Sequence, residues 1–289
     1  MQILANGLIN GLTLALLALG FSVVYLPTRV FAIALAGVYA LTPYLAWQCL
    51  QWHLPWGVTL PLSLLVVVLL SLAIERFNHR PLVRRGASPS AHMISSLGLF
   101  IILIQFVALI WGNETRVLRT GIDTTWMGWG VILTRSQLLA AGVAVVVLAS
   151  FYTWLRRTSL GLQFRALADN PVQLALYGYN TDRLRLLAAG MAGLLTGLSS
   201  LLVAYDVGFD PHTGLNVLLL AIVAVIVGGR HSFFAPILGG VLIGFLRAEV
   251  VWYLSARWQE AVTFLLLVVI LFFRPQGLLG SKGRLEADA

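Results

Sequence analysis

Two ionisable side chains, Arg247 and Glu249, lie inside an otherwise apolar stretch of the sequence, 235–254. They are two positions apart, so in a helix they leave on different faces. A charge inside a membrane span can contact a substrate or form a gate, and the alternative is that both side chains snorkel toward the nearer membrane surface. We therefore take both residues as gate candidates.

The other residues that could do chemistry form no catalytic or metal-binding pattern. The histidines are expected to be scattered across loops without ligand spacing, at His53, His79, His92, His212 and His231. Cys49 is the only cysteine, which excludes an internal disulfide and a thiolate metal cluster. The only lysine, Lys282, follows a serine, so the chain lacks a Gly-Lys-Ser/Thr phosphate-binding loop. We expect no enzyme activity, no cofactor and no metal. The pattern favours a membrane transport path whose energy comes from another protein.

The elements that position these residues are expected to be membrane helices. Hydrophobic residues make up 59% of the 289-residue chain and charged residues only 10%, whereas soluble domains carry about a quarter charged residues. A surface of this composition suits a bilayer. The net charge of +8 does not indicate nucleic-acid binding, because the basic residues stand in short gaps between apolar blocks.

A spanning helix needs about 20 mostly apolar residues, and the sequence offers nine candidates. They are 2–26, 30–51, 56–76, 93–112, 135–155, 184–206, 214–229, 235–254 and 258–273. The seventh is short, and the glycine pair Gly228 and Gly229 could end it early, so eight crossings with one re-entrant segment remain an alternative. The prediction is an all-α polytopic membrane protein, with 1–289 as a single transmembrane domain.

The distribution of arginine predicts the orientation in a bacterial inner membrane. If nine spans alternate, one side receives Arg29, Arg76, Arg80, Arg84, Arg85, Arg156, Arg157, Arg165, Arg183, Arg185, Arg230, Arg274, Lys282 and Arg284. The other side receives Arg116, Arg119, Arg135 and Arg257. Because positive loops stay in the cytoplasm, we expect the N-terminus outside and the C-terminus and segment 156–185 inside.

A weak internal symmetry is visible between the first and second parts of the chain. The stretches 8–25 and 32–41 resemble 188–205 and 218–229, five spans later, so the copies would point in opposite directions. Inverted repeats of this kind enclose a substrate path near the midplane, although glycine-rich spans can look alike without any repeat. Small or polar residues in these regions are the path candidates Asn10, Thr13, Ala36, Gly37 and Asn216.

Segment 156–185 is a polar island between two apolar blocks, and it predicts two short helices. The first helix would carry apolar or small residues on one side, at Leu160, Phe164, Leu167 and Ala168. Pro171 can open the second helix, and Gly178 can end it. Such a pair would either project as a docking element or rest on the lipid headgroups as an amphipathic connector.

The same segment, GLQFRALADNPVQLALYGYNTDRL, resembles the cytoplasmic coupling motif of ABC importer permeases. More narrowly, it resembles the branched-chain amino acid permease family, whose two membrane subunits are known as LivH and LivM. The motif residues are Gly161, Arg165, Ala166, Ala168, Asp169, Gly178 and Asn180, and the closing phrase of the family matches at Arg274, Pro275, Gly277 and Gly280. The likeness extends over nearly the whole chain and is closer to LivH.

The resemblance implies a complete machine and a role for each part. This chain would pair with a LivM-like second permease, receive substrate from a periplasmic binding protein, and couple to two cytoplasmic ATPases that hydrolyse ATP. The residues implied to couple are Gly161, Arg165, Ala166, Asp169 and Gly178.

The chain also departs from the family pattern. Ala32 and Leu35 stand where the family often has Asn and His, and Arg247 stands where it often has Glu. A more apolar lining at 30–36 favours a neutral, hydrophobic amino acid as cargo. The alternatives are a urea or short-chain amide permease of the same family, an ion-coupled secondary carrier, or a passive channel.

Overall fold

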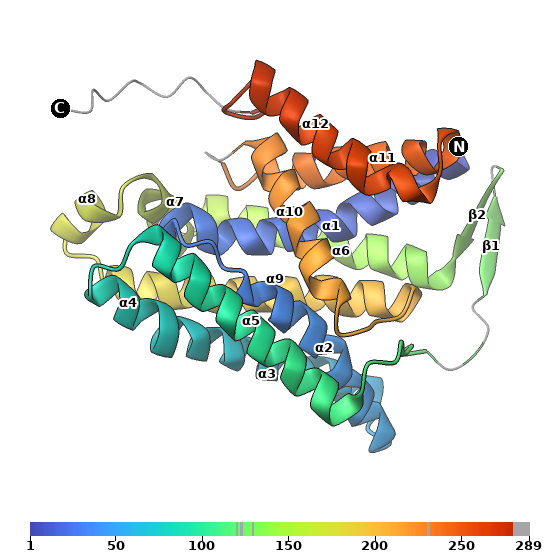
Figure 1. Ribbon diagram of the computed structural model, residues 1–289, viewed down its shortest axis with the longest axis horizontal. Coiled ribbons are helices and arrows are strands. Elements are labelled where there is room, and N and C mark those ends of the chain that lie inside the picture. The colour runs from blue at the N-terminus through green and yellow to red at the C-terminus, as the bar shows by residue number, and fades with distance from the viewer. Residues whose placement is uncertain (120, 122–123, 129, 230–231, 280–289) are drawn as a thin grey trace.

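The computed structural model describes residues 1–119, 121, 124–128, 130–229 and 232–279, and the chain is predominantly helical (Figure 1). The longer helices are α1 (Gln2–Thr28), α2 (Ala34–Gln51), α3 (Trp56–Ile74), α5 (Pro89–Trp111), α6 (Arg135–Arg157), α9 (Thr181–Asp206), α10 (Thr213–Gly228), α11 (Ala235–Tyr253) and α12 (Gln259–Phe273). The shorter ones are the π-helical turn η1 (Glu75–His79), α4 (Arg80–Arg84), α7 (Ser159–Asp169), α8 (Pro171–Leu176) and the 3₁₀ turn η2 (Ala256–Trp258). One antiparallel hairpin joins β1 (Thr125–Gly128) to β2 (Val131–Thr134).

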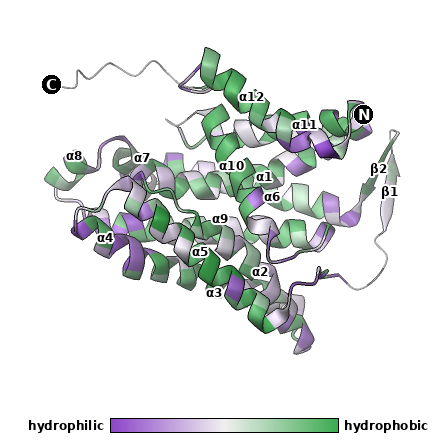
Figure 2. Ribbon diagram, in the orientation of Figure 1, coloured by the Kyte–Doolittle hydropathy of each residue, from purple (hydrophilic) through white to green (hydrophobic). Residues whose placement is uncertain are grey.

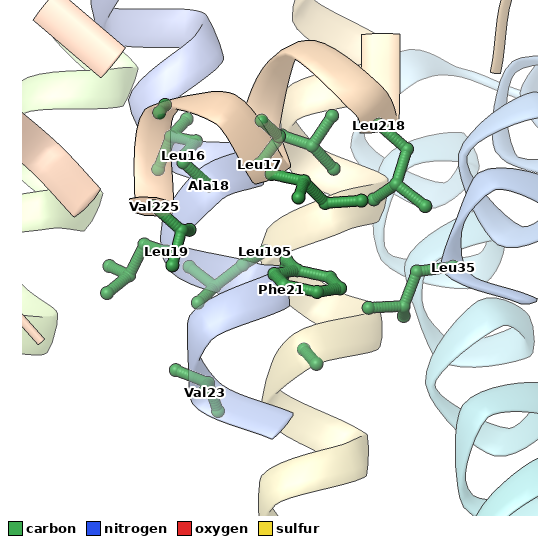
Figure 3. Packing of buried hydrophobic residues seen from close by; sticks show 14 of the residues in the cluster. Leu16, Leu17, Ala18, Leu19, Phe21, Val23, Leu35, Leu195, Leu218 and Val225 are labelled. Atoms are coloured by element: carbon green, nitrogen blue, oxygen red, sulfur yellow. The ribbon is translucent and has the colours of Figure 1, made fainter. Parts of the chain in front are cut away.

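Helix α1 forms the centre of the bundle. Of its most apolar window, 89% is buried inside the molecule, compared with 6% for the span Ala256–Phe273 at the periphery. Its side chains pack against α2, α9 and α10 in one continuous apolar core, in which Leu17, Phe21 and Leu218 meet (Figure 3). Apolar residues thus surround α1 from about Leu14 to Leu26, as expected for a helix segment buried within a membrane bundle.

The prediction of an all-α polytopic membrane protein is confirmed. Seven helices in the described part of the chain are long and apolar enough to cross a bilayer, and apolar residues dominate the helical surfaces (Figure 2). Helix α10 has only 16 residues, about 24 Å at 1.5 Å per residue, and α2 is not among the seven. The number of crossings therefore stays a prediction.

The polar short helices and the hairpin lie at opposite ends of the molecule. Figure 1 shows α4, α7 and α8 at one end and the N-terminus with β1 and β2 at the other. The Gln2 side chain fixes the hairpin to α1, because its Nε2 donates to the Ile132 carbonyl at 2.9 Å and its Oε1 accepts from the Ile132 amide at 2.7 Å. Which end faces the cytoplasm remains a prediction.

Helices α1 and α9 run side by side in opposite directions. Ser199 Oγ donates to the Thr13 carbonyl at 2.8 Å, while Gly20, further along α1, faces Thr196, earlier in α9. The opposite directions agree with those expected of an inverted repeat, and the repeat itself stays a prediction.

The glycine pair after the seventh apolar stretch ends the helix, as predicted. Helix α10 stops at Gly228, and Gly229 adopts a positive φ of 124°. The described part of the C-terminal phrase folds back onto this end, where the amides of Leu278 and Leu279 donate to the carbonyls of Val227 and Gly228 at 2.9 and 3.0 Å. These bonds satisfy carbonyls that a helix end leaves free.

Candidate functional site

A cavity of about 600 Å³ lies between the first half of α1 and the second half of α11, with α2, α9, α10 and α12 completing its walls. We call it the N-terminal cavity. Its lining consists of Gln2, Ile3, Asn6, Asn10, Thr13, Leu14, Tyr39, Ser199, Val203, Val217, Leu220, Gly244, Arg247, Ala248, Val251, Trp252 and Gln259. The cavity is large enough for a small solute.

Helix α1 contributes a polar stripe to this cavity. Gln2, Asn6, Asn10 and Thr13 are spaced by four, four and three residues, which places them on one face. At 1.5 Å per residue the stripe is about 16 Å long, about half of the roughly 30 Å hydrocarbon core. A solute moving along it would find hydrogen-bond partners from the helix end to about the membrane midplane.

Tyr39 of α2 and Ser199 of α9 contribute polar groups near the inner end of the stripe. The Ser199 hydroxyl is used by the Thr13 carbonyl. The Tyr39 side chain is only 5% exposed, and its hydroxyl has no hydrogen-bond partner within the described ranges. Because a buried unpaired hydroxyl costs about 1–3 kcal/mol, Tyr39 is a candidate contact for a bound solute.

Arg247 of α11 lines the cavity and is held by Gln259 of α12. Arg247 Nη2 donates to Gln259 Oε1 at 3.2 Å, and Gln259 Nε2 donates back to the Arg247 carbonyl at 3.3 Å. Glu249, the other gate candidate, is not part of the lining. The two neighbouring charges therefore have different surroundings, as their positions on different helical faces predict.

Alongside the cavity, the α1 and α11 backbones are in close contact from Gly7 to Ala15. A Cβ on Gly11 would lie 2.8 Å from Val241 Cα, and a Cβ on Gly240 would lie 2.6 Å from Ala15 Cα. Only glycine allows such close approach. We call these contacts the glycine seal; beyond it lies the apolar core of Figure 3.

Helix α7 is docked at the opposite end of the molecule. Thr158 Oγ1 accepts from the Gly161 amide at 3.0 Å, and a Cβ on Gly161 would lie 2.7 Å from Leu155 Cα, so the turn from α6 into α7 requires glycine here. Phe164 is buried between Trp154 and Phe233, with ring centroids 6.0 and 5.8 Å apart. Aromatic packing therefore connects α7 to α6 and to the residues preceding α11.

The buried side of α7 differs by one position from the predicted apolar side. Phe164 and Leu167 are buried and Ala168 partly so, but Leu160 is 44% exposed, and Gly161 takes its place. Leu160 stays exposed although it shares the apolar side, because the tight turn at Gly161 brings Gly161 against α6.

Helix α8 and the following turn have the predicted bounds and an apolar exposed surface. Asn170 Oδ1 caps α8 by accepting from the amides of Val172 and Gln173 at 3.1 and 3.0 Å, and Gly178 has a φ of 84°. The large apolar side chains exposed on α7, α8 and this turn are Leu160, Leu162, Val172, Leu176, Tyr177 and Tyr179. We call them the α7–α8 surface. Exposed apolar side chains fit both alternatives, a docking element and an amphipathic connector that rests on the lipid headgroups.

A buried charged network, not anticipated from the sequence, lies between α9 and the end of α3. Arg185 Nε donates to Glu75 Oε1 at 3.0 Å, with both side chains largely buried, and Arg80 pairs with Asp182. Nearby, the rings of His79 and His92 stack 5.8 Å apart. These two histidines lie in η1 and α5, so the expectation that all histidines are scattered in loops was wrong. No group of three metal-ligating side chains forms among the described residues.

Comparison with known proteins identifies the family. The family model described as "Branched-chain amino acid transport system / permease component" matches residues 3–271. The chain belongs to this family of permeases. It is 28% identical to the high-affinity branched-chain amino acid transport system permease protein BraD of Pseudomonas aeruginosa and 25% identical to LivH of Escherichia coli K12, over 97% of this chain and 95% of each relative.

A solved structure shares the permease fold. The chain matches the PsaBC structure from Streptococcus pneumoniae in complex with Fab with a TM-score of 0.52, over 95% of this chain and 92% of that one. At 14% identity this likeness concerns the fold alone.

The permease's candidate residues fall into two groups at opposite ends. The motif residues Gly161, Arg165, Ala166 and Asp169 lie in α7, and Gly178 follows α8. Asn10, Thr13 and Arg247 line the N-terminal cavity.

The remaining path candidates do not line this cavity. Ala36 is fully buried against Gly214, Gly37 faces Leu103 of α5, and Asn216 is exposed. Asn6, Tyr39, Ser199 and Gln259 line the cavity but were missed in the sequence. The regular polar spacing along α1 was a signal that could have identified Asn6.

Proposed function

We propose that this permease is the transmembrane subunit of an ABC importer that carries a neutral or branched-chain amino acid. It forms half of the translocation path beside a LivM-like second permease. A periplasmic binding protein delivers the cargo. Each of two cytoplasmic ATPases binds one permease, and on this chain it binds the α7–α8 surface.

The observation that carries this proposal is the amphipathic lining of the N-terminal cavity. Asn6 and Asn10 form a polar wall, while Val203, Val217 and Leu220 form an apolar one. An amino acid with an aliphatic side chain has the same two-sided character, and each of its parts would meet a matching wall.

The apolar residues at 30–36 do not contribute to this argument. Ala32 and Leu35 are buried in the core and line a separate, much smaller cavity of about 20 Å³. Their apolar character therefore says nothing about the polarity of the N-terminal cavity, and the preference for an amphipathic cargo rests on the cavity walls.

The arrangement of cavity, apolar core and α7–α8 surface supports transport driven from a distance. The apolar core around the second half of α1 lies between the cavity and the α7–α8 surface, so we expect that a solute needs a conformational change to pass. The α7–α8 surface, at the far end, is apolar and exposed, as a docking site for a partner would be. A passive channel would need no such surface.

An exposed residue of α8 offers a test that spares the fold. Leu176 is 82% exposed, so Leu176→Asp should leave the bundle intact but weaken ATPase docking. In proteoliposomes with all partners, we expect ATP-driven leucine uptake to fall at least tenfold. The control is Val207→Asp. Val207 is 74% exposed and follows Asp206, which accepts a hydrogen bond from Ser136 at the start of α6, next to the hairpin. Equal uptake by both variants would refute the coupling role, and ATP-independent uptake by the unaltered chain would indicate a channel or carrier.

A further inference from the structure

Arg247 is the only charged side chain that lines the N-terminal cavity in the described part of the chain. No ion pair involving Arg247 exists among these residues. The carboxylate that acts on it electrostatically is Glu260, which is exposed in the first turn of α12 and outside the lining. The cavity therefore presents a positive charge to a solute without a fixed negative charge on its walls.

The guanidinium group of Arg247 is oriented but only partly used. Gln259 accepts from Nη2, and Gln259 is itself held in place because its Nε2 donates to the Arg247 backbone carbonyl. Nη1 is shielded from solvent and has no hydrogen-bond partner in the described ranges. A guanidinium carries five N–H donors in a planar fork that matches a carboxylate, so donors remain for a ligand.

Arg247 lies near the N-terminal end of the α1 polar stripe. Helices α1 and α11 are antiparallel, since Gly11 meets Val241 and Gly7 meets Phe245 and Ala248. Arg247 thus lies near the level of Gly7. Tyr39, the second lining residue with an unpaired polar atom, lies near the inner end of the stripe.

We propose that Arg247 is a specificity-determining residue that binds the carboxylate of the solute within the N-terminal cavity. This inference rests on the proposed function and adds which chemical group is recognised. A small molecule with a free carboxylate gains a charge-assisted hydrogen bond at Arg247. Urea and carboxamides have no negative charge to offer and lack this gain.

Accessibility of an introduced thiol tests the inference on the full chain without transport. Val251 lies one helical turn beyond Arg247 on the same face and lines the cavity. In nanodiscs, the Val251→Cys chain, with Cys49→Ala to remove the native thiol, would be labelled with a methanethiosulfonate reagent. The added solutes are leucine and two analogues with the same side chain. 4-Methylpentanoate has the carboxylate but no amino group, and leucinamide has the amino group but a carboxamide in place of the carboxylate.

We expect leucine and 4-methylpentanoate to slow labelling and leucinamide to have little effect. Arg247→Gln should weaken this protection about 10- to 100-fold in solute concentration, the range typical of losing a hydrogen bond to a charged group. Arg247→Lys should recover part of it. Arg257→Gln, which removes an exposed arginine outside the lining, is the matched control and should behave as the parent.

Protection by leucinamide equal to that by leucine, or protection unchanged in Arg247→Gln, would overturn the inference. The proposed function is tested separately by ATP-driven leucine uptake with all partners present. If Arg247→Gln does not weaken protection but the parent chain takes up leucine normally, only the inferred carboxylate contact is refuted. If the parent chain shows no ATP-driven uptake, the proposed function is refuted.

Discussion

The glycine seal gives a quantitative prediction for Gly240→Ala. A Cβ at this position would lie 2.6 Å from Ala15 Cα. Carbon atoms pack at about 3.5 Å or more, so α1 and α11 would have to separate locally by about 0.9 Å. Overpacking of this size typically costs about 1–3 kcal/mol. Because α1 is the central helix, the cost should appear in the stability of the whole bundle.

The assay compares Gly240→Ala with a glycine that has free space around it. A Cβ on Gly98, in α5, meets nothing within 4 Å, and alanine is intrinsically favoured over glycine in a helix. In equilibrium unfolding by sodium dodecyl sulfate, we expect Gly240→Ala to be destabilised by about 1–3 kcal/mol and Gly98→Ala to be unchanged or more stable. Equal stability of the two variants would show that the helices are not in contact at the seal.

Three further changes have outcomes that follow directly from the contacts. Arg185→Ala leaves the buried Glu75 carboxylate without its partner and should lower the free energy of unfolding by about 3–5 kcal/mol in the same assay. Adding Glu75→Gln should recover part of this loss, and no recovery would contradict the pairing. Asn170→Ala removes the cap of α8 and should cost that helix about 1 kcal/mol, seen as faster amide exchange confined to α8. Gln2→Ala removes both bonds to Ile132 and should speed exchange of the Ile132 amide, which would stay slow if the hairpin were held by its own strand pairing.

The sequence predicted the elements with strong local signals. Pro171 and Gly178 bracket a helix and its turn because their backbone preferences are nearly independent of the surroundings. The exposure of Leu160 could not be predicted, because periodicity alone does not reveal that Gly161 is needed for close contact with α6. Local sequence signals therefore predicted the positions of α7 and α8, but not the contacts that hold these helices against the bundle.

The candidate site was harder to predict because it depends on contacts between distant segments. Asn10 and Thr13 were identified by their polarity, and both line the cavity. Ala36 was chosen for its small size, but small residues in membrane helices also serve packing, and Ala36 packs against Gly214. Nothing in the sequence could show that Arg185 reaches Glu75, 110 positions away.

Helix α11 has a consequence for how force can travel through the molecule. Phe233, two residues before α11 begins, packs on Phe164 of α7. The middle of α11 forms the glycine seal, and Arg247 lies towards the C-terminal end of the helix. A helix of 19 residues is a stiff rod of about 28 Å. Under the proposed function, a displacement of α7 would be transmitted along this one helix to Arg247. Docking of the ATPase and binding of the solute would then be mechanically coupled.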